Sequence, residues 1–312
     1  MKKRIYIFAA VLSIYTNLGA QNITFNADTL YPEGIAYNSA NDMFFVSSLR
    51  SGKIGTVDKK GNYKVFINSP EMISAIGINL NKKTNTLLVC SSDPGVSIKT
   101  GSATQRKFAK LIGYDATSGK QKFIADLGAL NPSGFNFAND VTFDEEGNSY
   151  VTNSFSPIIY KIDKEGTPSI FVTSEVWKGE GFSLNGIVYH PDGFLIVAQS
   201  NTGNLYKVSL NNPTTIKKIE TEPILGVDGM IFNPKKNELI VISNARQEIS
   251  QLKSDDNWYS TKKMNSVKSV DTFPTTGTIV GANYYILNAK LNELFNPTAP
   301  KSNSFTIQEV KF

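Results

Sequence analysis

Four oxygen-bearing side chains lead similar short phrases that recur along the chain. The phrases are Glu33-Gly34-Ile35, Asn139-Asp140-Val141, Asn185-Gly186-Ile187 and Asp228-Gly229-Met230. Two carboxylates and two carboxamides that converged on one point would be costly to bury without a partner, and the two carboxylates would repel each other. A divalent cation removes both problems, and an all-oxygen set suits Ca²⁺, with Mg²⁺ or Mn²⁺ as less favoured ions. The sequence therefore predicts a metal site made by Glu33, Asn139, Asn185 and Asp228.

Two weaker copies complete a set of six, Ile76-Gly77-Ile78 and Thr276-Gly277-Thr278. No copy is led by His or Cys, which disfavours zinc. Each copy opens a short apolar run, and a turn and a second apolar run follow, a spacing typical of antiparallel strands. Copies that lie about 40–50 residues apart, with one longer interval, indicate propeller blades of four strands each. The chain is predicted to be all-β, with one six-bladed β-propeller over residues 21–312.

The strands that flank this repeat array are predicted to close the ring. An apolar strand at 22–26 precedes the first blade and another at 305–310 follows the last inner pair, so we expect the two to pair in one blade, because open sheet edges invite association. The leading residues of the phrases, which we call the marker residues, then surround the axis at one end of the propeller, the marker face. The long connection within 91–110 also lies on this face, where we expect a lid, with a disordered linker as the alternative.

The first twenty residues have the pattern of an export signal. Lys2-Lys3-Arg4 is followed by an apolar stretch at 5–18 and by the small residues of a cleavage site before Gln21. We predict a signal peptide at 1–20 and a secreted or periplasmic protein, with an uncleaved anchor as the alternative. This segment supplies three positive charges of the net +5, so the mature chain lacks the basic character of a nucleic-acid-binding protein. We expect no membrane span after cleavage, and the oligomeric state is left open.

The phrases resemble those of the senescence-marker-protein/gluconolactonase/luciferin-regenerating-enzyme family of six-bladed propellers, to which diisopropylfluorophosphatase and the paraoxonases are related. The motifs that carry the resemblance are Pro32-Glu33-Gly34, Ala138-Asn139-Asp140, Leu184-Asn185-Gly186 and Val227-Asp228-Gly229. The resemblance spans essentially the whole mature chain. It implies that Glu33, Asn185 and Asp228 bind a catalytic divalent metal. It implies for Asn139 either a fourth ligand or a place beside metal-bound water or substrate.

The departures from this family concern the walls of the pocket. Sugar-lactone hydrolases of the family tend to carry Arg at the position of Phe137, and an apolar ring cannot make charged bidentate bonds to hydroxyl groups. The positions at which relatives carry His correspond here to Ile76 and to a residue near Thr276. A lactone or ester of apolar character is therefore the expected substrate. The residues expected to contact it are Phe137, Ile76, Thr276 and Asn244, although Asn244 could equally bond between blades.

The resemblance implies metal-assisted hydrolysis, in which the cation polarises the carbonyl and acidifies a bound water. Asp228 is the candidate general base, Glu33 an anionic anchor, and Asn139 the second candidate catalytic residue. The alternative is a non-catalytic propeller with a structural calcium that binds a ligand or a protein partner. His190, the only histidine, is predicted to lie in a hairpin on the opposite face and to take no part in catalysis.

Overall fold

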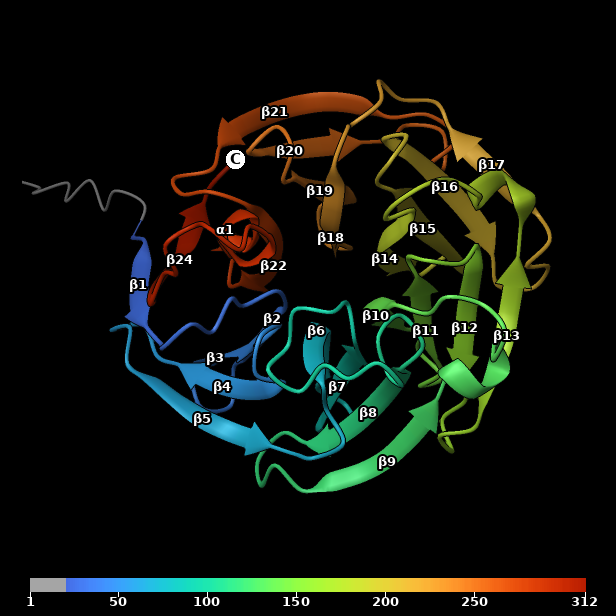
Figure 1. The fold of residues 1–312 in the computed structure, drawn as a ribbon. Helices are drawn as coiled ribbons and strands as arrows, with labels where there is room; N and C mark the ends of the chain where they lie inside the picture. The colour runs from blue at the N-terminus through green and yellow to red at the C-terminus, as the bar shows by residue number, and fades with distance from the viewer. Residues whose placement is uncertain (1–20) are drawn as a thin grey trace, which may run out of the picture.

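The computed structural model describes residues 21–312, so the predicted signal peptide at 1–20 lies outside the described residues. The described chain forms six four-stranded antiparallel sheets around a central axis, as Figure 1 shows in a view along that axis. The prediction of an all-β, six-bladed propeller is confirmed. Within residues 21–312, no helix has the length and apolar character needed to span a membrane.

Five blades are continuous meanders in which the innermost strand is followed in order by the next three. The first blade contains β2 (Ile35–Asn38), β3 (Met43–Ser47), β4 (Lys53–Val57) and β5 (Tyr63–Asn68). The second contains β6 (Ser74–Asn81), β7 (Thr86–Ser92), β8 (Ala109–Asp115) and β9 (Gln121–Asp126). The third contains β10 (Ala138–Phe143), β11 (Ser149–Asn153), β12 (Ile158–Ile162) and β13 (Pro168–Thr173).

The fourth and fifth blades repeat the same order. The fourth contains β14 (Leu184–His190), β15 (Phe194–Gln199), β16 (Asn204–Ser209) and β17 (Ile216–Ile219). The fifth contains β18 (Val227–Asn233), β19 (Glu238–Ser243), β20 (Glu248–Lys253) and β21 (Lys262–Lys268). Buried apolar clusters join neighbouring blades, for example the first with the second and the fourth with the fifth, and the largest runs through the first, second, third and sixth blades, so each blade completes the core of its neighbours.

The sixth blade is assembled from both ends of the chain. It contains β22 (Pro274–Val280), β23 (Asn283–Asn288), β24 (Ser304–Val310) and β1 (Ile23–Asn26). Phe25 of β1 pairs with Phe305 of β24, and their rings lie 5.9 Å apart between centroids. Because β1 covers the free edge of β24, the predicted closure of the ring by the terminal strands is confirmed.

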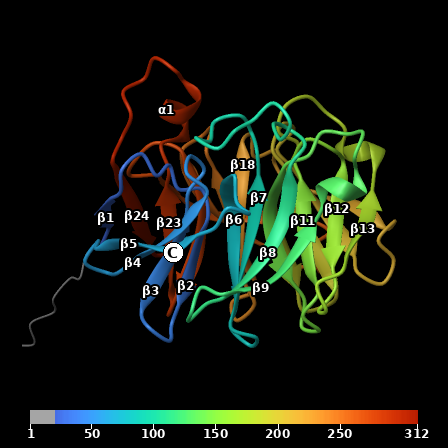
Figure 2. The same cartoon turned by 60° about the horizontal axis from the view of Figure 1, so that its bottom comes forward.

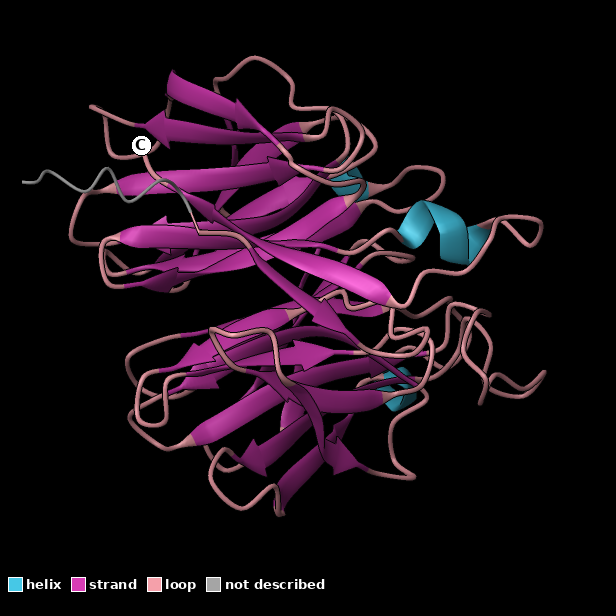
Figure 3. Ribbon diagram, turned by 90° about the vertical axis from the view of Figure 1, so that its left-hand side faces the viewer, coloured by secondary structure: helices cyan, strands magenta, loops and turns pink. Residues whose placement is uncertain are grey.

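One end of the propeller carries the long connections, and the other carries short hairpins. The short helix α1 (Leu291–Phe295) and the 3-10 turns at Gly128–Leu130 and Glu175–Trp177 are the helices of the described residues, and Figure 3 shows them gathered toward one end. Figure 2 shows α1 rising above the strand ends on this side. The loops that enter the innermost strands lie here as well, so this end is the marker face.

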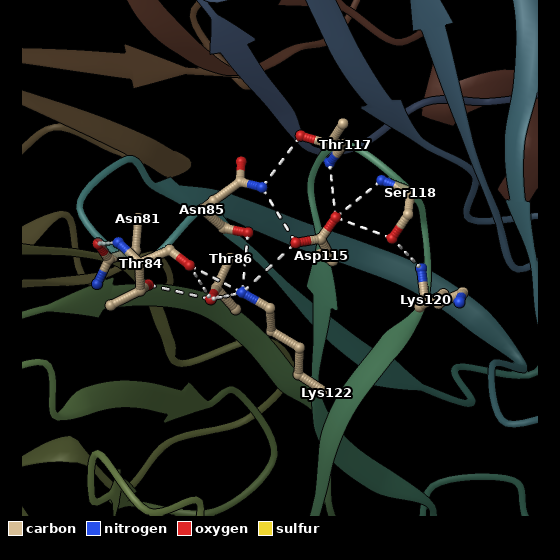
Figure 4. Close-up of polar contacts among 9 residues, drawn as sticks. All are labelled: Asn81, Thr84, Asn85, Thr86, Asp115, Thr117, Ser118, Lys120 and Lys122. Atoms are coloured by element: carbon tan, nitrogen blue, oxygen red, sulfur yellow. Dashed lines mark hydrogen bonds and ion pairs between the residues drawn. The ribbon is translucent and has the colours of Figure 1, made fainter.

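The hairpins of the opposite face are held by local polar contacts. In the second blade the Lys122 ammonium donates to the carbonyl oxygens of Thr84 at 2.8 Å and Asn85 at 3.1 Å (Figure 4). Asp115 accepts from the backbone and side chain of Ser118, both at 2.8 Å. The backbone bond from Ser118 is the largest of the effects that lower the pKa of Asp115 to about 2. These contacts join two hairpins and give this face a structural role.

A β-bulge marks the start of the innermost strand in five blades. In the third blade Ala138 pairs with Asn153 and Val141 with Val151, so Asn139 and Asp140 together oppose a single residue. The same shift occurs in the second, fourth, fifth and sixth blades. A bulge bends the strand and re-aims the side chain that it contains. The repeated phrase in the sequence is therefore a repeated bulge in the structure.

The register corrects one sequence assignment. Pro274 pairs with Asn288 and Gly277 with Ile286, which makes Thr275 the sixth marker residue. Thr276 was expected there but lies one position later, where most blades have glycine. Where glycine occupies that position, neighbouring blades approach closely: a Cβ on Gly229 would lie 2.2 Å from the Thr276 hydroxyl oxygen. Thr275 and Thr276 are identical in type, so only the strand pairing shows which of the two is the marker.

We expect Phe25→Ala to weaken the whole propeller, because Phe25 is 1% exposed and joins β1 to β24. The loss should be about 3 kcal/mol or more, which corresponds to a melting temperature lower by roughly 6 °C or more for a domain of this size. Thr24→Ala is the matched control, since Thr24 lies in the same strand and is exposed. Equal melting temperatures for the two variants, measured by circular dichroism, would contradict the closure.

His190 lies in the hairpin between β14 and β15 on the face opposite the marker residues. It is 8% exposed and stacks on Phe194 with centroids 4.2 Å apart. The Asp192 amide donates to its Nδ1 at 3.1 Å, which favours the neutral ring. Burial lowers the pKa of His190 below its ordinary value, and the nearby Asp192 carboxylate opposes that shift only in part.

The His190 pKa predicts how stability changes with pH. A folded-state pKa below the unfolded value means that the unfolded chain takes up the proton first. The neutral His190 ring therefore contributes to the free energy of unfolding above the unfolded pKa of about 6.5, and this contribution is lost as the pH falls through the folded pKa. The ring proton of this single histidine, followed by NMR, should titrate at lower pH in the folded protein than in urea. A folded pKa equal to or above the urea value would contradict this expectation.

Candidate functional site

The four predicted metal-binding residues line one cavity of about 290 Å³ on the marker face. Asn139, Asn185 and Asp228 each lie in the bulge at the start of an innermost strand, and Glu33 precedes β2. Each of the four side chains is at most 7% exposed. Four different blades therefore deliver four oxygen-bearing side chains to the same cavity.

Serine residues orient the two amides. The Asn139 Nδ2 donates to the Ser154 hydroxyl at 2.8 Å, and the Asn185 Nδ2 donates to the Ser200 hydroxyl at 3.1 Å. Because the NH₂ group is held by serine, the Oδ1 of each amide is left for another partner. The Asn139 Oδ1 is buried and has no hydrogen-bond partner among the described residues.

The same serines connect neighbouring blades. The Ser154 hydroxyl donates to the Leu184 carbonyl at 2.5 Å, and the Ser200 hydroxyl donates to the Val227 carbonyl. Leu184 and Val227 directly precede the marker residues of the following blades. Sequence reasoning missed Ser154 and Ser200. The signal was present, because in the third and fourth blades a serine directly follows the second strand.

Asp228 and Glu33 are buried carboxylates without a cationic partner. The Asn244 amide donates to the Asp228 Oδ2 at 3.0 Å, whereas the Glu33 Oε2 is buried with no hydrogen-bond partner in the described chain. Burial is the largest cause that raises the pKa of both groups, and the Asp228 charge raises the pKa of Glu33 further. No Lys, Arg or His of residues 21–312 lines the cavity to balance these charges.

This donor set fits a divalent cation. The free oxygens of Glu33 and Asn139 need a partner that no described side chain supplies, and two carboxylates would balance a charge of two. Carboxylate and amide oxygens are ligands that Ca²⁺ prefers. Among the described residues, no three His, Cys, Asp or Glu side chains come together as a metal site. Any cation here would therefore depend on the two amides.

The structure separates the four residues expected to bind substrate. Phe137 and Asn244 line the cavity, and the bond from Asn244 to Asp228 lies within the fifth blade rather than between blades. Ile76 is 1% exposed within the apolar core, and Thr276 lines a second cavity of about 250 Å³ at the other end of the tunnel. Neither Ile76 nor Thr276 lines the site. The apolar Ile76 packs into the core, and Thr276 lies one position after the marker residue, against Gly229 of the fifth blade.

The connection within 91–110, expected to form a lid, does not line the cavity. It folds around Asp93, whose carboxylate accepts from the hydroxyls of Thr100 and Thr104, each at 2.7 Å. The connection 289–303 of the sixth blade, which includes α1, reaches the cavity instead and contributes Leu291 and Phe295. The sequence did not indicate this element, because it follows the last copy of the repeated phrase and no repeat interval measures its length.

Glu33, Asn139, Asn185 and Asp228 form a polar floor, and the walls above it are mainly apolar. The six apolar side chains that line them are Leu49, Phe137, Phe182, Phe273, Leu291 and Phe295. The Phe137 and Phe182 rings meet edge to face with centroids 5.3 Å apart, a preferred aromatic geometry. The cavity therefore combines an anionic, oxygen-rich floor with an apolar wall.

Solved structures share this fold over nearly the whole chain. The major allergen Mala s 1 of Malassezia sympodialis has a TM-score of 0.74 and 17% identity, covering 93% of this chain and 96% of that chain. A gluconolactonase from Xanthomonas campestris has a TM-score of 0.65 and 12% identity, covering 94% and 90%. The calcium-binding protein regucalcin from Agrobacterium tumefaciens has a TM-score of 0.63 and 14% identity, covering 91% and 92%.

The sequence matches no family model, and no curated protein matches it. At identities this low, similarity establishes the fold alone. The resemblance to this group of six-bladed propellers is confirmed at that level, and the activity has to be argued from the site.

The serine contacts predict a difference between two matched variants. Ser154→Ala should lower the affinity for Ca²⁺ by about 10–100-fold, because the Asn139 amide loses the partner that orients it. Ser92 is equally buried and donates to the Ala138 carbonyl at 3.1 Å, but its blade carries Ile76 in place of an amide. Ser92→Ala should therefore retain Ca²⁺ affinity in calorimetric titrations. Equal losses in both variants would show that the serine acts only between blades.

Proposed function

We propose that this protein is a divalent-cation-dependent hydrolase of lactone or ester bonds, with Ca²⁺ as the favoured cation, and that it is exported after removal of residues 1–20. The observation that carries the proposal is the pair of buried, unpartnered oxygens, Glu33 Oε2 and Asn139 Oδ1, on the floor of one cavity. The shared fold with a gluconolactonase and a calcium-binding protein supports it.

The four floor residues would hold the cation, which when bound polarises a carbonyl and makes water more acidic. Glu33 supplies a negative charge and a free oxygen. Asn139 and Asn185 present their amide oxygens because serines hold their NH₂ groups. The burial of all four groups excludes bulk water, which strengthens every electrostatic interaction on the floor.

Asp228 is the proposed general base. Its Oδ2 is held by Asn244 at 3.0 Å, which fixes the carboxylate within the cavity that it lines. Asp228 takes a proton from the attacking water as the water oxygen bonds to the carbonyl carbon. The carbon–oxygen bond of the lactone or ester then breaks, and the departing oxygen takes up that proton. A positioned base of this kind contributes about 10²–10⁴-fold to the rate.

The second candidate function is a ligand-binding propeller with a structural calcium. The observation that favours it is the wall composition, since no His, Lys or Arg of the described residues lines the cavity. The wall therefore offers no acid, base or cationic side chain that would assist a reaction at the floor. The two candidates share the cation and differ in turnover, so they can be separated by experiment.

Calcium should stabilise the protein, because it would relieve two buried carboxylates. Ca²⁺ at 100 times its dissociation constant adds about 2.7 kcal/mol, so the melting temperature should rise over that in chelator. Glu33→Gln should reduce this rise, and Asp192→Asn, on the opposite face, should leave it unchanged. If no divalent cation raises the melting temperature of the wild-type protein, the metal site is refuted.

Asp228→Asn should lower kcat for lactones or aryl esters by about 10²–10⁴-fold, measured at Ca²⁺ concentrations that saturate each variant. A panel of these substrates with Ca²⁺, Mg²⁺, Mn²⁺ or chelator identifies the active ion. Asp192→Asn again serves as the control. Unaltered turnover in Asp228→Asn would rule out the base, and calcium stabilisation without turnover of any substrate would favour the ligand-binding propeller.

A further inference from the structure

We infer that the connection 289–303 selects the substrate, and that Leu291 and Phe295 bind an uncharged aromatic or aliphatic group of the lactone or ester. The inference rests on the proposed function of this cavity and gives the cavity wall a role in substrate binding. Two of the six apolar side chains of that wall come from α1.

The wall offers little to a charged or polyhydroxylated substrate. Three polar side chains line it above the floor, and each already donates within the protein. The Asn244 amide bonds to Asp228 at 3.0 Å, the Asn201 amide to the Glu180 carbonyl at 3.2 Å, and the Ser200 hydroxyl to the Val227 carbonyl. These bonds leave the Asn201 and Asn244 amide oxygens as the main polar partners beside six apolar side chains. Most hydroxyls of a polyhydroxylated substrate would therefore lose their water at the wall without an equivalent partner, which carries a desolvation penalty.

Helix α1 is held in place over the cavity by Glu293. The Glu293 carboxylate accepts from the Tyr31 hydroxyl at 3.2 Å and from the Ser302 amide and hydroxyl at 3.1 Å and 3.0 Å. Lys301 donates to the Asn296 carbonyl at 2.7 Å and closes the end of the connection. These bonds fix a five-residue helix that is too short to be stable alone.

The fixed helix presents one apolar face to the cavity. Leu291 and Phe295 are four residues apart, a spacing that places side chains on the same side of a helix. Leu291 is 5% exposed, but Phe295 is 45% exposed. A large aromatic side chain left half exposed at the mouth of a cavity is available to cover an apolar ligand, and its burial would add to binding.

The volume bounds the size of the group. The cavity measures about 290 Å³, roughly twice the 150 Å³ of an engineered apolar cavity that binds benzene. A lactone ring on the floor therefore leaves room for about one phenyl ring or a short alkyl chain along the wall. The size and polarity of the cavity therefore favour uncharged lactones or esters that carry one phenyl or short alkyl substituent.

The test compares γ-butyrolactone with γ-nonalactone, γ-phenyl-γ-butyrolactone and glucono-δ-lactone in the wild-type protein with Ca²⁺. We expect kcat/KM for the pentyl or phenyl lactone to exceed that for γ-butyrolactone by about tenfold or more, because an apolar substituent is buried. Glucono-δ-lactone should be the poorest substrate. Phe295→Ala and Phe182→Ala should each reduce the ratio of substituted to unsubstituted lactone by about threefold or more.

The matched control is Phe135→Ala, since Phe135 is 54% exposed among the loops of the marker face but does not line the cavity. It should leave the ratio unchanged. A ratio near one in the wild-type protein, or a ratio insensitive to Phe295→Ala, would overturn the inference while leaving a hydrolase in place.

Binding of ketones provides a readout that does not require hydrolysis. Calorimetry with cyclopentanone, 2-pentylcyclopentanone and 2-phenylcyclopentanone measures the wall directly, because these compounds have no scissile bond. Tighter binding of a substituted ketone that weakens in Phe295→Ala supports the inference even if no lactone is hydrolysed, in which case the proposed hydrolase fails alone. If neither substituted ketone binds more tightly than cyclopentanone, the wall has no such preference and the inference fails.

Discussion

The burial of two carboxylates on one cavity floor, without a cationic side chain beside them, is the constraint on which the rest of the site depends. Glu33 and Asp228 come from blades that are not neighbours, and each is nearly inaccessible to water. Ionised groups in such surroundings require a compensating charge or a proton. The oxygen atoms left free on Glu33 and Asn139 indicate a charge that binds oxygen. A hard divalent cation meets both requirements at once.

The bulge and the serine contacts explain how a repeating fold builds an irregular site. The bulge gives five of the six blades the same means of directing one side chain toward the axis, and glycine in the next position of most blades lets adjacent blades approach closely. The residue that follows the second strand then orients the marker side chain by a hydrogen bond. Serine holds an amide by its NH₂ group in the third and fourth blades, whereas Asn244 holds the Asp228 carboxylate in the fifth. Chemistry therefore varies while backbone geometry is retained.

The connection 289–303, which covers the cavity, is not part of the repeated blade pattern. Residues 289–303 lie between two strands of the blade that the terminal strands close, so the element that shapes the wall is attached to the part of the ring that depends on both chain ends. Glu293 links α1 to Tyr31, which lies two residues before Glu33. The wall and the floor thus share a support, although the floor would carry the reaction and the wall would set the substrate.

The sequence alone determined the number of blades, the closing strands and the four residues of the floor, because a local phrase repeated at blade spacing fixes both strand order and the position of a marker in each strand. It could not identify the marker residue of the sixth blade, because Thr275 and Thr276 are equivalent in type and only the pairing of Pro274 with Asn288 distinguishes them. It also could not assign Ser154, Ser200 or Asn244 to particular partners. Which loop reaches the cavity was decided by tertiary structure, since the connection at 91–110 folds onto the buried Asp93 and the one at 289–303 is held over the site by Glu293. Periodicity is a local property of the chain, whereas the contacts of a long loop depend on residues that only the closed ring brings together.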